Sequence, residues 1–187
     1  MFKSKQKRAV PSGSRESVES GNMSGSSNEN LTASKEKDTV DMILKQKVHF
    51  NLFYMGMVQN VNLTSAKKRD TEAQLIDQVE EAQIEGKLPL SVTEEDKVAI
   101  TVSRHGIKVM DTSRQEVFQR HPLHTIAQLI HYNDGFGKQN IALKIGQVGK
   151  IINQCYQCYI YQCHTEEEAN AICQCVRRLF DAITAKA

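Results

Sequence analysis

Cysteine and histidine side chains near the end of the chain are of the types that bind zinc, and one pair has CxxC spacing. Five cysteines and one histidine fall there: Cys155, Cys158, Cys163, His164, Cys173 and Cys175. Residues three apart on a strand point to opposite faces, and helix residues two apart also face different directions, so these spacings do not converge on one ion. We therefore expect small packing residues here, with no metal and no other cofactor.

Two further patterns are typical of catalytic or nucleotide-binding proteins. Gly135-Phe136-Gly137-Lys138 lacks the glycine spacing and the Ser or Thr of a phosphate-binding loop, and a strand rather than a helix is expected after it. The 6 histidines are scattered among predicted strands and turns, and no Ser or Cys is spaced beside an oriented base. The chain is therefore predicted not to be an enzyme.

Composition divides the chain into a polar tail and one folded domain. Apolar residues are sparse before Val48 and frequent after it, which predicts disorder over residues 1–42 and a domain over residues 43–187. The net charge of +2 leaves no concentrated basic stripe for nucleic acid. No apolar run approaches the roughly 20 residues of a membrane span, and no signal-peptide core follows Met1, so we expect a soluble, intracellular protein.

The predicted tail is rich in Ser and carries a compact basic cluster. This cluster consists of Lys3, Lys5, Lys7 and Arg8. Such a cluster is a candidate nuclear-localisation signal and is also attracted to anionic lipid. A solvated chain end without either role is the alternative interpretation.

Alternation of apolar and polar residues predicts a series of short strands, as in residues 48–54. Arg104-His105-Gly106 and Asn133-Asp134-Gly135 are turn sequences, and Pro122 interrupts the alternation between two strands. The predicted strands are residues 45–61, 98–102, 107–109, 116–120, 126–132, 140–145 and 155–163.

Helical spacing of apolar residues predicts two helices. The first begins at Thr71, which forms a capping box with Gln74, and ends near Gly86. The second begins after Thr165, an N-cap residue with Glu168 three positions on, and closes the domain. Its apolar face is predicted to contain Ala169, Ile172, Cys173, Val176, Phe180 and Ile183.

This order of elements indicates an antiparallel α+β domain: a β-sandwich or open barrel of about seven strands, capped by the C-terminal helix. A sheet edge beside an amphipathic helix forms a groove in which an extended peptide can add a strand. We place this groove between residues 124–132 and 165–185.

A series of motifs makes the chain similar to a known family. In chain order they are Met1-Phe2, Glu85-Gly86-Lys87-Leu88-Pro89, Gly106-Ile107-Lys108-Val109, Arg120-His121, Tyr132-Asn133-Asp134-Gly135, Tyr161-Gln162-Cys163 and Ala169-Asn170-Ala171-Ile172-Cys173. Their order and spacing resemble the integrin cytoplasmic domain-associated family, small phosphotyrosine-binding (PTB) proteins that bind integrin beta tails.

The resemblance implies a PTB fold, which is similar to the pleckstrin-homology fold, and an adaptor function. Proteins of this family bind an NPxY-type motif in the integrin beta cytoplasmic tail, compete there with talin or kindlin, and so restrain integrin activation and cell adhesion. A second implied partner is the Krev-interaction-trapped scaffold protein, which presents its own NPxY motif with a basic segment. The implied location is cytoplasmic and membrane-peripheral at adhesion sites, through integrin alone, with the nucleus as a further compartment.

The resemblance also implies particular site residues. Leu123, Ile126 and Ala127 correspond to groove residues on the peptide-pairing strand, and Phe180 to a groove residue on the terminal helix. Glu80 corresponds to an acidic residue that receives the scaffold's basic segment. We add three residues from the same strand and helix to the predicted groove: Ile130, Ile172 and Val176.

A lipid-binding function is the alternative to peptide binding. The pleckstrin-homology fold has a similar architecture, and the tail is basic, so a phosphoinositide or membrane binder would fit the same elements.

Overall fold

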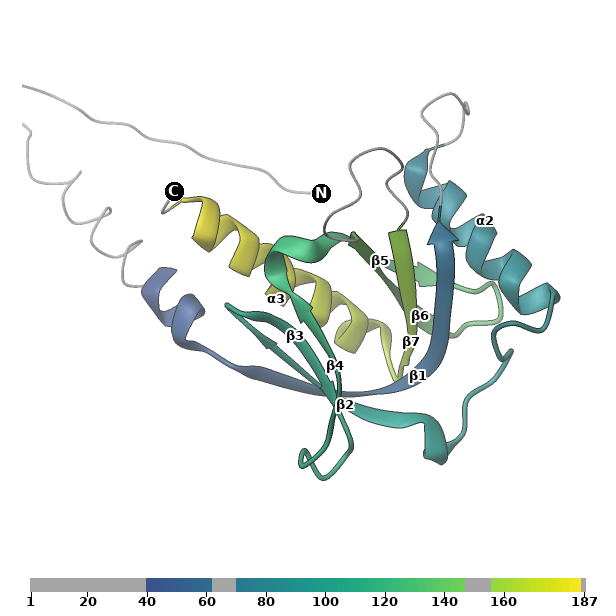
Figure 1. The fold of residues 1–187 in the computed structure, drawn as a ribbon, viewed down its shortest axis with the longest axis horizontal. Helices are drawn as coiled ribbons and strands as arrows, with labels where there is room; N and C mark the ends of the chain where they lie inside the picture. Colours follow the sequence, from purple (N-terminus) through teal and green to yellow (C-terminus); the bar gives the residue numbers. More distant parts are fainter. Residues whose placement is uncertain (1–39, 62–69, 147–155, 186–187) are drawn as a thin grey trace, which may run out of the picture.

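Seven strands form one antiparallel sheet in the order β4-β3-β2-β1-β7-β6-β5 (Figure 1). The structure is a computed structural model that describes residues 40–61, 70–146 and 156–185. The strands are β1 (Val48–Val61), β2 (Lys97–Ser103), β3 (Gly106–Met110), β4 (Val117–Pro122), β5 (Ile126–Asn133), β6 (Gln139–Gly146) and β7 (Tyr156–Cys163). The helices are α2 (Thr71–Ile84) and α3 (Glu166–Thr184), with 3₁₀ turns at Glu94–Asp96 and Leu123–Thr125.

The predicted fold class is confirmed, because the domain is an antiparallel α+β structure with a C-terminal helix. Residues 40–45 are helical and precede β1. The predicted disordered tail, including Lys3, Lys5, Lys7 and Arg8, lies almost wholly outside the described residues, as does Cys155. No helix in the described ranges has both the length and the apolar character of a membrane span.

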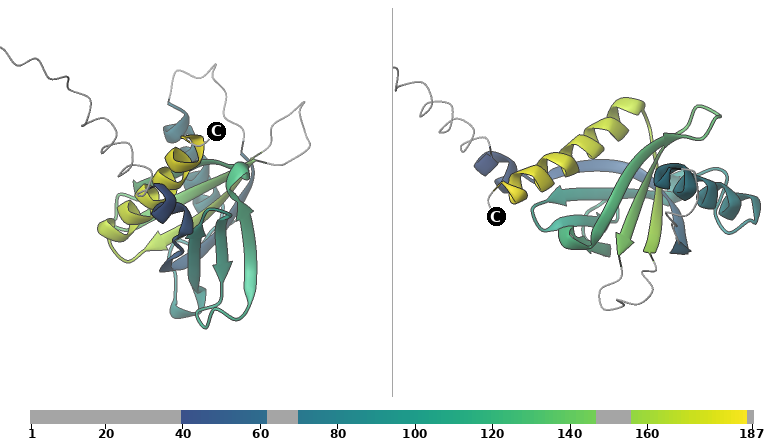
Figure 2. Two further views of the ribbon diagram at one scale, coloured as in Figure 1. Left: turned by 90° about the vertical axis from the view of Figure 1, so that its left-hand side faces the viewer. Right: turned by 90° about the horizontal axis from the view of Figure 1, so that it is seen from above.

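Strand β1 connects the two halves of the sheet. Its first part pairs with β2 through Val48–Phe53, and its second part pairs with β7 through Phe53–Val61. The register with β7 shifts next to Gly56, whose φ is +127°. This φ is strained for residues other than glycine, and a Cβ there would also lie 2.7 Å from Leu88 Cδ2. Figure 2 shows the strands of the two halves running in different directions, with α3 lying across them.

The sheet has a hydrophobic core on each face. On the first face, Ile172, Val176 and Leu179 of α3 pack with residues from most of the strands. On the second face, Leu75 and Val79 of α2 pack on the region of β5, β6 and β7. Because helices cover both faces there, the strand positions around Ala142 and Ile160 are fully enclosed.

The helix ends and faces differ in part from the predictions. The capping box at Thr71 is wrong, because Thr71 is the first residue of α2 and Asp70 precedes it as the N-cap residue. Thr165 does cap α3, and its Oγ1 accepts a hydrogen bond from the Glu168 N–H at 3.2 Å. The predicted apolar face of α3 is partly wrong, because Ile183 is exposed.

The buried positions of α3 form a stripe that is rotated about the helix axis relative to the predicted apolar face. They are Ala169, Ile172, Val176, Leu179 and Ala182. Cys173 and Phe180 therefore lie at the flank of this stripe, half-buried, where α3 meets β5.

Candidate peptide-binding groove

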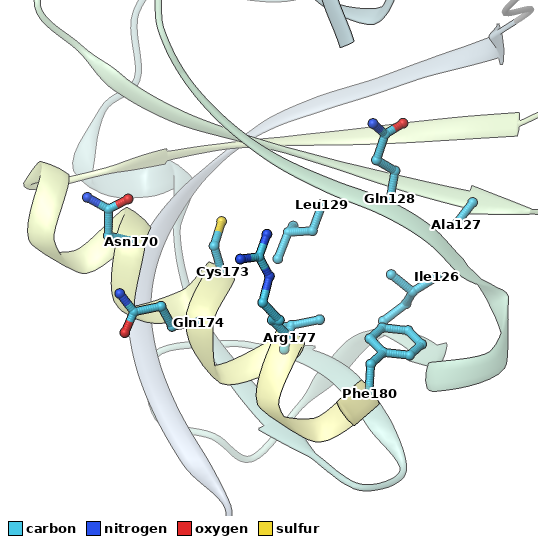
Figure 3. A pocket seen from close by; sticks show the side chains of 10 residues that line it. Ile126, Ala127, Gln128, Leu129, Asn170, Cys173, Gln174, Arg177 and Phe180 are labelled. Carbon is cyan, nitrogen blue, oxygen red and sulfur yellow. The ribbon is translucent and has the colours of Figure 1, made fainter. Parts of the chain in front are cut away.

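The groove predicted from the sequence lies between one edge of the sheet and the terminal helix. Among the described residues β5 pairs only with β6, so its other edge carries backbone groups available to another strand. Helix α3 runs beside this edge, and the space between them has a volume of about 570 Å³. The residues that line it are Ile126, Ala127, Gln128 and Leu129 from β5, and Asn170, Cys173, Gln174, Val176, Arg177 and Phe180 from α3. Figure 3 shows their side chains and labels all of them except Val176.

A β-bulge at the start of β5 decides which of its side chains enter the groove. The register with β6 passes from Ile126↔Ile145 directly to Gln128↔Lys144, which leaves Ala127 as the extra residue. Ile126 and Leu129 therefore both belong to the face covered by α3, while Ile130 belongs to the core under α2. In Figure 3 the Gln128 side chain points away from α3, as the bulge requires.

Four of the predicted groove residues come together in the structure. Ile126, Ala127, Val176 and Phe180 all line the space between β5 and α3. Leu123 and Ile172 are buried in the core on the α3 side, behind the groove. Ile130 lies on the opposite face of the sheet, for the reason just given.

The sequence reasoning did not assign Leu129, Gln128 or Arg177 to the groove. A signal for Arg177 was available, because stepping back from Phe180 by one helical turn reaches it, and a further turn reaches Cys173. For Leu129 no such signal exists, because the bulge becomes visible only when β5 is paired with β6.

The side chain of Gln128 on β5 is held in place by two hydrogen bonds. Gln128 Oε1 accepts from Lys144 Nζ at 3.1 Å, and Gln128 Nε2 donates to Glu72 Oε1 at 3.4 Å. Burial lowers the pKa of Lys144, whose ammonium also lies 4.6 Å from the centre of the Tyr156 ring. These contacts satisfy the polar groups of Gln128 on the side of β5 that faces away from α3.

The cysteines lie in several different environments. Burial raises the pKa of the Cys158 and Cys163 thiols to about 12, as expected of packing residues. Cys173 lines the groove, whereas Cys175 lines a second hollow on the other side of α3. Within the described ranges no three His, Cys, Asp or Glu residues lie close enough together to hold a metal ion.

Glu80 lies away from the groove. It is exposed on α2, and its charge adds to the burial that raises the pKa of the Tyr132 hydroxyl, which places it near the far end of β5. Glu81 and Glu85 line a separate shallow hollow between α2 and β1. An acidic surface on α2 is therefore spatially distinct from the groove beside α3.

Comparison with known proteins identifies the family of this chain. The family model described as Beta-1 integrin binding protein matches residues 1–187. Integrin beta-1-binding protein 1 of Mus musculus is 32% identical over 168 residues, which cover 89% of this chain and 76% of the mouse protein. The Bos taurus protein of the same name is 33% identical over 136 residues, or 72% of this chain and 66% of the bovine protein. The chain therefore belongs to the beta-1 integrin binding protein family.

Proposed function

We propose that this protein is an adaptor that binds the cytoplasmic tails of beta integrins through an NPxY-type motif. The observation that carries the proposal is the edge of β5 that no described strand pairs with, beside a groove whose lining includes Ile126, Leu129 and Phe180. Membership of a family whose relatives are named for integrin beta-1 binding supports the choice of partner.

The geometry suits recognition by strand addition. An extended peptide would pair its backbone with β5, and alternate side chains would then point toward α3. An apolar peptide side chain would contact Ile126 and Phe180, which are large apolar residues at one end of the groove (Figure 3). The Asn-Pro pair of the motif favours a turn and removes a backbone donor, so the motif would end the added strand.

We further propose a consequence for integrin regulation. An adaptor that occupies the NPxY motif excludes talin or kindlin from the same segment, and so restrains integrin activation. A second ligand, the Krev-interaction-trapped scaffold protein, would use its own NPxY motif in the groove and place its basic segment near Glu80. The exposed carboxylates of α2 support this second contact by charge complementarity.

The test is calorimetric titration of the full chain with an integrin beta-tail peptide that contains NPxY, beside a peptide with the tyrosine replaced by alanine. We expect binding to the first peptide and at least tenfold weaker binding to the second. Binding of neither peptide, or equal binding of both, would contradict the proposal.

A matched pair of variants on α3 locates the site. Phe180→Ala removes a groove side chain, whereas Ile183→Ala removes an exposed apolar side chain that lies outside the groove. We expect Phe180→Ala to weaken peptide binding about tenfold and Ile183→Ala to leave it unchanged. Ile126 is less suitable for this purpose, because it is only 8% exposed and a polar substitution there would disturb the core.

A further inference from the structure

We propose that Arg177 makes the groove select peptides that carry an Asp or Glu side chain close to the NPxY motif. The inference rests on the proposed function, because it concerns the side chains of the same bound peptide. It adds a charge requirement to a site that otherwise recognises backbone and apolar groups.

Arg177 is the charged residue among those that line the groove. It lies one helical turn before Phe180, and in Figure 3 its side chain extends from α3 toward β5, with Cys173 and Leu129 on either side of the guanidinium group. The positive charge of Arg177 opposes the rise in the pKa of the Cys173 thiol, which agrees with this position.

Within the described part of the chain, the ion pairs join other residues: Lys87 with Glu85, Lys97 with Glu94, and His164 with Glu168. No described Asp or Glu forms an ion pair with Arg177. The groove thus presents a guanidinium group that has no ion-pair partner among the described residues and can donate hydrogen bonds to a ligand.

A peptide strand laid along β5 would cover this group. Removing a guanidinium from water without an acceptor is unfavourable, whereas a carboxylate offers two oxygens that match its forked donors. A basic side chain at the same place would be repelled, so the preference has both an attractive and a repulsive part.

The spacing limits where the acidic residue lies in the peptide. Three helical residues advance about 4.5 Å along α3, while side chains on one face of a strand repeat about every 6.6 Å. The residue that meets Arg177 is therefore the next one on the same face as the residue that meets Phe180, about two positions away.

Arg178 provides a matched control, because it is adjacent in sequence but lines the hollow on the other side of α3, with Ile43 and Phe50. Arg177→Glu and Arg178→Glu change the net charge of the protein equally. A difference between them reports the local position of the charge and not the general attraction of an acidic peptide.

The experiment is calorimetry of the full chain with NPxY peptides in which one residue outside the motif is changed in turn to Ala, Glu or Lys. We expect one position at which Glu binds about five- to tenfold tighter than Ala and Lys binds weaker than Ala, with the difference decreasing at high salt. Arg177→Glu should reverse this order so that the Lys peptide binds best, and Arg178→Glu should preserve it.

Three outcomes would overturn the inference, and they can be told apart from failure of the proposed function. Suppose that the peptides with Glu, Ala and Lys bind equally at every position, while binding still needs the tyrosine of the motif. The adaptor function then stands, and the proposed role of Arg177 is wrong. The same holds if Arg177→Glu and Arg178→Glu have equal effects, or if the Lys peptide binds as tightly as the Glu peptide at the position where Glu exceeds Ala. Absence of binding by every NPxY peptide would contradict the proposed function itself.

Discussion

Ile126 and Leu129 face the same groove although they lie three positions apart on one strand. A regular strand would put them on opposite faces, and the bulge at Ala127 removes this difference. The same bulge turns the neighbouring Ile130 into the core under α2. The adjacent residues Leu129 and Ile130 therefore differ in role: Leu129 lines the groove, and Ile130 stabilises the core.

Alanine substitutions of Leu129 and Ile130 should separate the effect on peptide binding from the effect on stability. Ile130→Ala is expected to lower the free energy of unfolding by about 2–4 kcal/mol, because Ile130 is buried in the core under α2. Leu129→Ala is expected to destabilise the fold less, because Leu129 is half-buried, and to weaken binding of an NPxY peptide about tenfold. Urea unfolding and calorimetry measure the two effects. Equal peptide affinities for the folded variants would contradict the assignment of Leu129 to the groove.

The order of strands and helices could be predicted from the sequence because period-2 and helical patterns, together with turn residues, report local structure directly. The sequence could not fully predict which side chains of each strand or helix face the core. The bulge in β5 depends on pairing with β6, and the rotation of α3, which buries Leu179 and exposes Ile183, depends on packing against the sheet. The groove joins segments far apart in the chain, so the sequence alone does not show which side chains of β5 and α3 face each other across it.

Gly106 should be among the least replaceable residues of the first hairpin. Its φ is +115°, and an added Cβ would lie 2.0 Å from the carbonyl oxygen of His121 on β4. We expect Gly106→Ala to lower the free energy of unfolding by about 3 kcal/mol or more, because the clashing atom belongs to the backbone and cannot turn aside. Urea unfolding measures this loss.

Gly135→Ala is the control for Gly106→Ala. Its φ of +80° is also left-handed, but nothing lies within 4 Å of an added Cβ, so only the local backbone cost of about 1 kcal/mol applies. If both variants lose the same stability, the close approach of β3 and β4 at Gly106 is not the cause.

His121 should make the stability of the fold depend on pH. Its ring is buried, lies 4.5 Å from the ring of Tyr159, and shares a 3.1 Å hydrogen bond with Gln119 Oε1. Burial lowers the pKa of His121 to about 4, whereas an unfolded chain has a histidine pKa of about 6.5. Between these values the unfolded chain binds a proton that the folded chain does not. The stabilising contribution of His121 is therefore complete above about pH 6.5 and is lost as the pH falls toward 4.

The measurement is urea unfolding of the protein and of the variant His121→Gln at several pH values between 7 and 4. Gln keeps a side-chain N–H donor but does not titrate, so the variant should lose stability less steeply by up to about 1.4 kcal/mol per pH unit. The carboxylates and the other histidines are common to both proteins. Identical slopes for the two proteins would show that His121 is not the titrating group.

Glu80→Lys should separate the two proposed peptide contacts. Glu80 lies on α2, which packs on the other face of the sheet from α3, so reversing its charge should change binding of an integrin-tail peptide less than about twofold. Binding of a scaffold peptide that joins an NPxY motif to a basic segment should weaken about three- to tenfold, because attraction at an exposed contact is replaced by repulsion. Glu95→Lys makes the same charge change at an exposed acidic residue remote from α2 and should leave both affinities unaltered. Equal weakening of both peptides by Glu80→Lys would mean that the two ligands share one surface, and the separate acidic contact on α2 would have to be abandoned.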